Sequence, residues 1–352
     1  MNIDMTKPIF FDRNRVYRIY KGGLLFSDFF GDERKDNYYP EEWVASTVKA
    51  LNPGSTIPLE GYSMVEHTDI TLNSLIEEHP EQMTGPLGSC PLLVKLLDSA
   101  MRLPLQIHPD RNFSQTYLNS NFGKTEMWIV LETREDASIY FGFKEKMTKE
   151  AFTTYIERSQ KDKTVMDTVL NRIPIKPGDV FLIPSRCVHA IGAGCLILEV
   201  QEPTDFTISP EYWCGDYPLP EEQMYLGLDR DIALDCFDYT VNGPDCLSLS
   251  KKIPRLLFQK NNIKKELLMG YEDTPCFSVN RYTVHDSSFV LETAPAVYIV
   301  TEGAGMITGD DYNRKLKKGM YFYLPYGAKG RCSVRSDRDL QIVECLPPLA
   351  DA

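Results

Sequence analysis

Short apolar runs that alternate with polar residues constrain this chain more than any other feature of its sequence. Strands of roughly four to eight residues produce this pattern, because successive side chains in a strand point to opposite faces of a sheet. Gly and Pro separate many of the runs, as expected for turns. The clearest predicted strands are 125–132, 137–143, 179–184 and 194–201. The chain is therefore predicted to be mainly β.

Helical patterns are fewer and lie between groups of strands. They cover residues 71–79, 148–160, 165–170 and 221–228. Thr148, followed by Glu150, is typical of the first residues of a helix. Because helices do not alternate with every strand, the pattern argues against a doubly wound parallel sheet. It favours an antiparallel barrel or sandwich with inserted helices.

A second group of strands follows the basic and apolar stretch 251–258. Its predicted members are 277–285, 296–302, 305–308, 315–324 and 340–345. A domain of about 100 residues is a common size. We therefore expect an N-terminal domain over residues 1–250, with the helical insertions, and a C-terminal domain over residues 251–352.

The charge balance limits the classes of partner. The 352 residues include 38 Lys and Arg against 50 Asp and Glu, a formal net charge of −12. Such a chain is a poor partner for nucleic acid or an anionic membrane. Neither a signal-peptide pattern nor an apolar run of roughly 18 residues is present, which predicts a cytoplasmic protein. The nine cysteines form no CxxC pair and are expected to be reduced and buried. Nothing in the sequence indicates the oligomeric state.

A small set of polar residues could carry chemistry. Gln106 and His108 are two residues apart on a predicted strand and share a face, and Lys124 and Glu126 do the same. His108, Glu126 and His189 supply two imidazoles and a carboxylate, which could hold Zn²⁺ and leave one position for water or substrate. The spacings match no short metal motif, so histidines bonded to backbone carbonyls remain the alternative. Of the other histidines, His67 and His79 are predicted to lie at the surface, and His285 is predicted to be structural.

Three blocks together resemble the type I phosphomannose isomerase family, the mannose-6-phosphate isomerases. They are PLLVKLLDSAMRLPLQIHPD, GKTEMWIVL and IKPGDVFLIPSRCVHAIGAGCLILEVQEPTD. The resemblance implies two cupin β-barrels, one Zn²⁺ per chain and a sugar or sugar phosphate substrate. It also implies that Gln106, His108, Glu126 and His189 are the metal ligands. The C-terminal cupin lacks His and Cys at the expected ligand positions and is predicted to be metal-free.

The resemblance also implies an aldose–ketose isomerase that interconverts mannose 6-phosphate and fructose 6-phosphate. Such a reaction needs a positioned base, and a divalent metal stabilises the developing oxyanions. Lys124 and Glu199 are the candidates for the base or for positioning the sugar hydroxyls. Lys95 is predicted to reach the pocket or to pair with a carboxylate.

Two departures from the family pattern bear on the substrate. Pro104 replaces a usual serine, and Ser209 replaces a usual arginine. A lost guanidinium is a lost bidentate phosphate ligand. Candidate replacements are Arg102, Arg111, Lys124 and Arg186. Two alternatives therefore stay open: an isomerase of an unphosphorylated or differently substituted sugar, and a non-catalytic sugar-binding cupin. An iron-dependent cupin dioxygenase is less favoured, because the implied ligand set includes Gln106.

Overall fold

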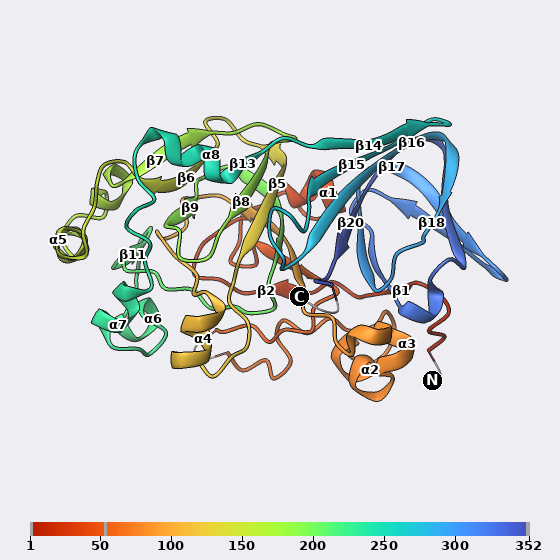
Figure 1. Ribbon diagram of the computed structural model, residues 1–352, viewed down its shortest axis with the longest axis horizontal. Coiled ribbons are helices and arrows are strands. Elements are labelled where there is room, and N and C mark those ends of the chain that lie inside the picture. Colours follow the sequence, from red (N-terminus) through yellow and green to blue (C-terminus); the bar gives the residue numbers. More distant parts are fainter. Residues whose placement is uncertain (1–2, 53–54, 350–352) are drawn as a thin grey trace.

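Two large antiparallel sheets form the body of the protein (Figure 1). The computed structural model describes residues 3–52 and 55–349. The seven-stranded sheet has the order β13 (Lys251–Lys252), β8 (Val180–Ile183), β5 (Glu126–Thr133), β10 (Cys195–Gln201), β4 (Leu93–Ser99), β3 (Glu41–Val44) and β2 (Arg15–Val16). The eight-stranded sheet has the order β1 (Ile9–Phe10), β19 (Tyr321–Leu324), β17 (Ala296–Gly309), β20 (Cys332–Leu346), β16 (Ser278–Val290), β15 (Ile263–Met269) and β14 (Arg255–Lys260), with β18 (Tyr312–Lys317) on β17.

Two smaller sheets and several short helices complete the fold. The small sheets are β7 (Leu170–Pro174), β6 (Ser138–Phe143) and β9 (His189–Ile191), and the hairpin of β11 (Trp213–Cys214) and β12 (Tyr217–Pro218). The α-helices are α1 (Phe26–Phe30), α2 (Leu72–Glu78), α3 (Pro80–Thr84), α4 (Arg111–Tyr117), α5 (Lys149–Ser159), α6 (Glu221–Met224), α7 (Arg230–Asp235) and α8 (Leu247–Ser250). Short 3₁₀ helices are η1 (Gly85–Leu87), η2 (Val165–Thr168), η3 (Pro244–Cys246) and η4 (Tyr326–Ala328). The chain is mainly β, as predicted. Within the described ranges, strand pairing closes none of these sheets into a barrel.

Strand alternation decides which side chains reach which core. On β10, Leu196, Leu198 and Val200 join the apolar core that also contains Val279, Val297 and Val343 of the eight-stranded sheet. Cys195 and Ile197 point to the opposite face, into the core beneath the inserted helices. Glu199 and Gln201 follow on that same face because side chains alternate with a period of two. Strand β10 therefore separates the apolar core between the two large sheets from the face that carries its polar side chains.

The two sheets exchange short strands at their edges. Ile9 and Phe10 of β1 pair with β19, so an N-terminal strand completes the sheet built mostly from residues 255–346. Lys251 and Lys252 of β13 pair with β8 in the seven-stranded sheet. Residues on both sides of position 250 thus contribute to both sheets.

The observed elements confirm one local prediction and alter two others. Thr148 caps α5 by accepting a hydrogen bond from the Ala151 N–H, as its position suggested. The predicted helix 165–170 is instead the 3₁₀ helix η2, because Leu170 already pairs with Phe143 as the start of β7. The predicted strands 296–302 and 305–308 are one strand, β17, with irregular pairing near Gly303. Gly303 has a φ of 75°, and a Cβ there would lie 1.9 Å from the Asp339 carbonyl oxygen. This glycine therefore bends a strand rather than ending it.

All nine cysteines are buried and free in the described chain. Over residues 3–52 and 55–349, the structure has no helix that is both long and apolar enough to span a membrane.

Candidate active site

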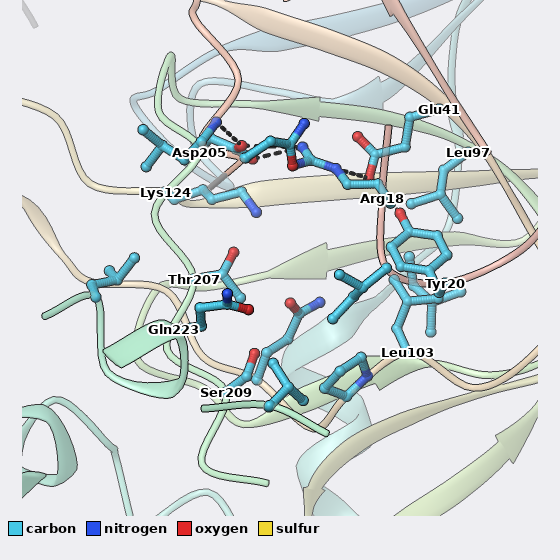
Figure 2. Close-up of a pocket in the computed structure, with 18 of the residues that line it drawn as sticks. Arg18, Tyr20, Glu41, Leu97, Leu103, Lys124, Asp205, Thr207, Ser209 and Gln223 are labelled. Atoms are coloured by element: carbon cyan, nitrogen blue, oxygen red, sulfur yellow. Dashed lines mark hydrogen bonds and ion pairs between the residues drawn. The ribbon is translucent and has the colours of Figure 1, made fainter. Parts of the chain in front are cut away.

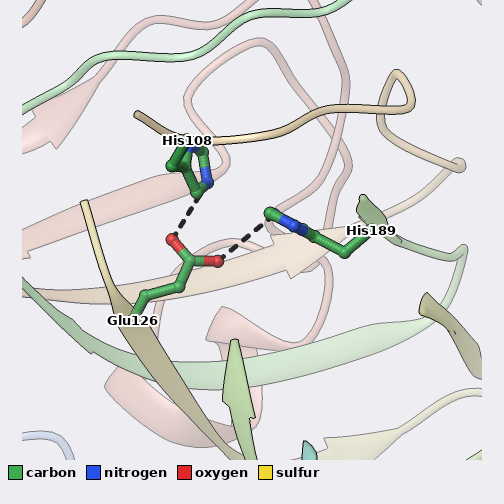
Figure 3. A group of neighbouring side chains, drawn as sticks. All are labelled: His108, Glu126 and His189. Carbon is green, nitrogen blue, oxygen red and sulfur yellow. Dashed lines mark ion pairs between the residues drawn. The ribbon is translucent and has the colours of Figure 1, made fainter. Parts of the chain in front are cut away.

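Three predicted metal ligands meet on one face of the seven-stranded sheet (Figure 3). Glu126 opens β5, His189 opens β9, and His108 lies in the segment between β4 and α4. The Nε2 atom of His108 is 3.2 Å from Glu126 Oε2, and the Nε2 atom of His189 is 3.5 Å from Glu126 Oε1. Their ligand atoms all lie within 4.8 Å of one another. Three segments far apart in sequence thus form one compact group.

The hydrogen bonds of the group leave three of its ligand atoms available. Both imidazoles bond a backbone carbonyl through Nδ1, His108 to Phe206 at 2.8 Å and His189 to Cys187 at 2.9 Å. This pairing directs each Nε2 atom toward Glu126. His189 Nε2 and both Glu126 carboxylate oxygens are buried without a hydrogen-bond partner. Buried polar atoms are normally satisfied, so these atoms fit a bound cation.

The charge states of the group also suit metal ligands. Burial, and then the Lys124 ammonium, lowers the pKa of His108 to about 3. Burial likewise lowers the pKa of His189. Although burial disfavours its carboxylate, His108 and Lys124 hold the pKa of Glu126 well below its usual range. Two neutral imidazoles and one carboxylate are the forms that bind a divalent cation.

Gln106, the fourth predicted ligand, is tied to His189 through the backbone. The Gln106 N–H donates to the His189 carbonyl at 2.9 Å, and the His189 N–H donates to the Gln106 carbonyl at 3.0 Å. The Gln106 side chain lines the adjoining cavity. Its position beside the group follows from this isolated bridge rather than from a regular strand, because Gln106 lies outside the large sheets.

A cavity of about 470 Å³ adjoins the group (Figure 2). The predicted site residues on its lining are Lys95, Pro104, Gln106, Lys124, Glu199 and Ser209. Lys124 connects the cavity to the group, since its Nζ atom is 3.1 Å from His108 Nε2 and 3.5 Å from Glu126 Oε2. A ligand in the cavity would therefore lie next to the group.

Glu199 and Lys95 form a buried pair on neighbouring strands of the cavity wall. Lys95 Nζ is 3.4 Å from Glu199 Oε1, and the two residues are directly opposite on β4 and β10. Burial, and then the nearby charge of Glu126, raises the pKa of Glu199 to about 7. Burial alone would lower the pKa of Lys95, but Glu41, Glu199 and Asp205 outweigh it and raise that pKa. Lys95 is therefore a cation, and Glu199 can gain and lose a proton near neutral pH.

Comparison with known proteins places the chain in a family. Mannose-6-phosphate isomerase ManA of Bacillus subtilis is 32% identical over 326 residues, which cover 92% of this chain and 94% of the relative. The mannose-6-phosphate isomerase of Streptococcus mutans is 30% identical over 345 residues, or 96% of this chain and 98% of the relative. The chain belongs to the mannose-6-phosphate isomerase family. No family model matches it.

Solved structures agree with this family assignment. The crystal structure of mannose 6-phosphate isomerase from Bacillus subtilis matches with a TM-score of 0.76 and 25% identity, covering 96% of this chain and 99% of that one. A putative mannosephosphate isomerase from Archaeoglobus fulgidus matches with a TM-score of 0.74 at 18% identity, covering 99% of this chain and 100% of that one. The second likeness concerns the fold alone.

Arg18 lines the cavity, although the sequence did not predict it as a site residue. Its guanidinium donates to Asp205 at 3.0 Å and 3.1 Å, and its Nε donates to Glu41 at 2.9 Å. The alternation in RVYRIY was the available signal, because it puts Arg18 and Tyr20 on one face. Both residues line the cavity (Figure 2). The partners of Arg18, Glu41 and Asp205, are 23 and 187 residues away in the chain, so no local pattern indicated these contacts.

Arg111 and Arg186, predicted to bind substrate, are absent from the cavity lining of the described chain. Arg111 donates from Nε to Glu202 at 2.8 Å. Arg186 donates to the carbonyls of Cys236 and Asp235, both at 3.1 Å. Each guanidinium thus donates to acceptors of the protein outside the cavity lining.

The side chains around Ser209 on the cavity wall are mostly uncharged. Thr207 and Gln223 lie beside Ser209 in Figure 2, and Glu222, which precedes Gln223 on α6, also lines the cavity. The cations on the described lining are Arg18, Lys95 and Lys124, and each lies within 4.0 Å of at least one carboxylate. The lining therefore offers a phosphate no cation without an acidic partner.

Proposed function

We propose that this protein is a zinc-dependent aldose–ketose isomerase that interconverts mannose 6-phosphate and fructose 6-phosphate. The observation that carries the proposal is the buried His108–Glu126–His189 group beside a cavity lined by Lys124 and Glu199. Its unpartnered ligand atoms suit one Zn²⁺ per chain, with Gln106 as a fourth ligand. Membership of the mannose-6-phosphate isomerase family supports the choice of substrate.

The proposal includes the division of the fold and the setting of the protein. We propose two cupin units, over residues 1–250 and 251–352, with metal only in the first. The partner is a small sugar or sugar phosphate, and the cytoplasmic location stays a prediction.

The reaction moves a proton between C1 and C2 of the open-chain sugar. When bound, the metal supplies positive charge that stabilises the enediolate oxygens. Glu199 breaks the C2–H bond by taking its proton, and the electron pair forms the C1–C2 double bond while the C1 carbonyl oxygen gains the proton of the C2 hydroxyl. Glu199 then returns a proton to C1 as the C2 carbonyl forms. Of the two candidate bases, the Glu199 carboxylate has a pKa of about 7, which suits proton transfer in both directions.

Lys124 and Lys95 have different proposed roles. Lys124 lies next to His108 and Glu126, so its ammonium can donate hydrogen bonds to the sugar oxygens nearest the metal group. Lys95 holds Glu199 through one carboxylate oxygen. Thus one lysine faces the substrate oxygens and the other forms the ion pair with the base.

The test is a coupled assay with zinc-loaded protein and both hexose 6-phosphates, in parallel with metal analysis. We expect one zinc per chain and turnover in both directions. A chain with metal bound but no isomerisation of any hexose phosphate would overturn the substrate assignment.

The neutral wall around Ser209 supports a second candidate, an isomerase of an unphosphorylated or differently substituted sugar. A dianionic phosphate there would face Ser209, Thr207 and Gln223 without a free cation. Comparing kcat/KM for mannose and mannose 6-phosphate separates the candidates, since equal values favour the second. In that case Ser209→Arg should raise the relative kcat/KM for the phosphate, whereas Ser209→Ala serves as the matched control. Retained sugar affinity without turnover, even with zinc, would instead indicate a non-catalytic sugar-binding cupin.

A further inference from the structure

Trp128 connects the proposed base to the metal group. It lies on β5 directly opposite Glu199 on β10, so both side chains project from the same face of the sheet. The indole Nε1–H donates to Glu199 Oε2 at 3.1 Å. The Trp128 ring also packs edge-on against the His189 imidazole, with 5.5 Å between centroids and 71° between planes. One fully buried side chain therefore contacts both parts of the site.

The two oxygens of Glu199 have different partners. Trp128 holds Oε2 through a directional hydrogen bond, whereas Lys95 Nζ lies 3.4 Å from Oε1. Lys95 is also within 4.0 Å of Glu41 and 3.7 Å of Asp205, so its ammonium is shared among three carboxylates. The ion pair alone leaves the carboxylate plane poorly defined. The indole is rigid and fully buried, and it supplies the directional contact that fixes the plane.

We infer that Trp128 is a positioning residue that orients the Glu199 carboxylate for proton transfer. The inference rests on the proposed role of Glu199 as the base. Without the indole N–H, the carboxylate can rotate toward Lys95, and the proton-transfer geometry is lost while sugar binding through the rest of the cavity continues. The effect should therefore appear in kcat rather than in KM.

A double-mutant cycle with Trp128→Phe and Glu199→Gln tests this inference. We expect Trp128→Phe to lower kcat by about tenfold, as for loss of one hydrogen bond to a charged group, with KM and zinc content within about twofold of wild type. In the Glu199→Gln background, the same substitution should cause little further loss, because the group that it positions is already inactive.

Trp43 provides a matched control. It is also fully buried in the same sheet, and its Nε1–H donates to Glu41 Oε2 at 2.7 Å. Any loss from Trp43→Phe should multiply with that from Glu199→Gln, since it acts on another carboxylate. If Trp128→Phe does not fold, benzothienylalanine at position 128 keeps the ring volume and replaces the N–H by sulfur.

The outcomes separate the inference from the proposed function. Independent, multiplying losses for Trp128→Phe and Glu199→Gln, or an unchanged kcat in the Trp128 variants, would overturn the positioning role. Full activity of Glu199→Gln would instead remove Glu199 as the base, and the inference with it.

Discussion

The central strands of the two large sheets carry similar carboxylates in different surroundings. β10 and β20 each occupy the fourth place in the order of their sheet, and each buries a glutamate, Glu199 or Glu344. Glu344 accepts hydrogen bonds from Tyr298 Oη at 2.6 Å and Asn280 Nδ2 at 2.9 Å, and lies 3.3 Å from Lys265 Nζ. Glu199 instead lines a cavity, next to a group in which His189 Nε2 and both Glu126 oxygens lack hydrogen-bond partners.

This difference separates a structural polar network from a site. A buried carboxylate whose oxygens are both bonded within the protein, and which lines no cavity, stabilises the fold and has little capacity for a ligand. Unpartnered buried atoms beside a cavity cost stability unless something binds them. We therefore expect changes near β10 to affect chemistry and changes near β20 to affect stability.

The largest expected effect comes from removing a metal ligand. His108→Ala should lower kcat by at least about a hundredfold, because charge stabilisation of the reacting oxygens is lost. Zinc content measured on the purified protein should fall in parallel. His285→Ala is the matched control, since the exposed His285 pairs only with Asp339 in the described chain and lies away from the cavity. Normal zinc content and turnover in His108→Ala would contradict the role of His108 as a metal ligand.

The corresponding change in the eight-stranded sheet should affect stability alone. Tyr298→Phe removes a hydrogen bond to the buried Glu344 carboxylate and should lower the free energy of unfolding by about 2 kcal/mol. Urea denaturation measures this loss, and kcat/KM should stay within about twofold of wild type. Tyr117→Phe, at a side chain exposed on α4, is the control for removing a hydroxyl. A drop in kcat/KM without a change in stability would show that β20 takes part in catalysis.

The pH dependence of kcat/KM should reflect the ionisation of Glu199. The base must be ionised, and its raised pKa of about 7 means that kcat/KM should fall tenfold per pH unit below this value. A bound cation favours the carboxylate, so the acid limb should lie at or below about pH 7. Glu199→Gln should remove the limb, and a limb well above pH 7 would contradict the assignment. Because the folded pKa exceeds the ordinary 4.5, this group also lowers the stability of the metal-free protein as pH rises from 4.5 to about 7.

The smallest effect concerns a contact between the two regions. Arg111 binds Glu202, and its Nη2 lies 3.9 Å from Cys276 Sγ next to β16. Arg111→Ala should cost at most about 1 kcal/mol in urea denaturation, because the pair is partly exposed. Isomerase kinetics should be unchanged within about twofold, with Arg111→Lys as the conservative comparison. A large increase in KM would show that Arg111 reaches the substrate despite its place outside the cavity lining.

The sequence by itself determined the local pattern and much of the candidate metal group. Alternation predicted the strands that became β5, β8 and β10, and it placed Glu126 and Lys124 together because the period of a strand is local. The position of Thr148 predicted the start of α5 for the same reason, since a cap bonds a backbone group three residues away. The resemblance then linked His108, Glu126 and His189, which spacing alone left unconnected.

Tertiary structure decided which distant residues meet. The salt bridge of Arg18 with Asp205, the Trp128–Glu199 hydrogen bond and the pairing of β1 with β19 depend on strand register and packing between segments far apart in the chain. The same packing placed Arg111 against Glu202 and Arg186 against the Cys236 carbonyl, and it left Ser209 among mostly uncharged side chains. Local periodicity assigns a side chain to a face of its strand, but the neighbours that it meets there depend on how the strands pair and the sheets pack.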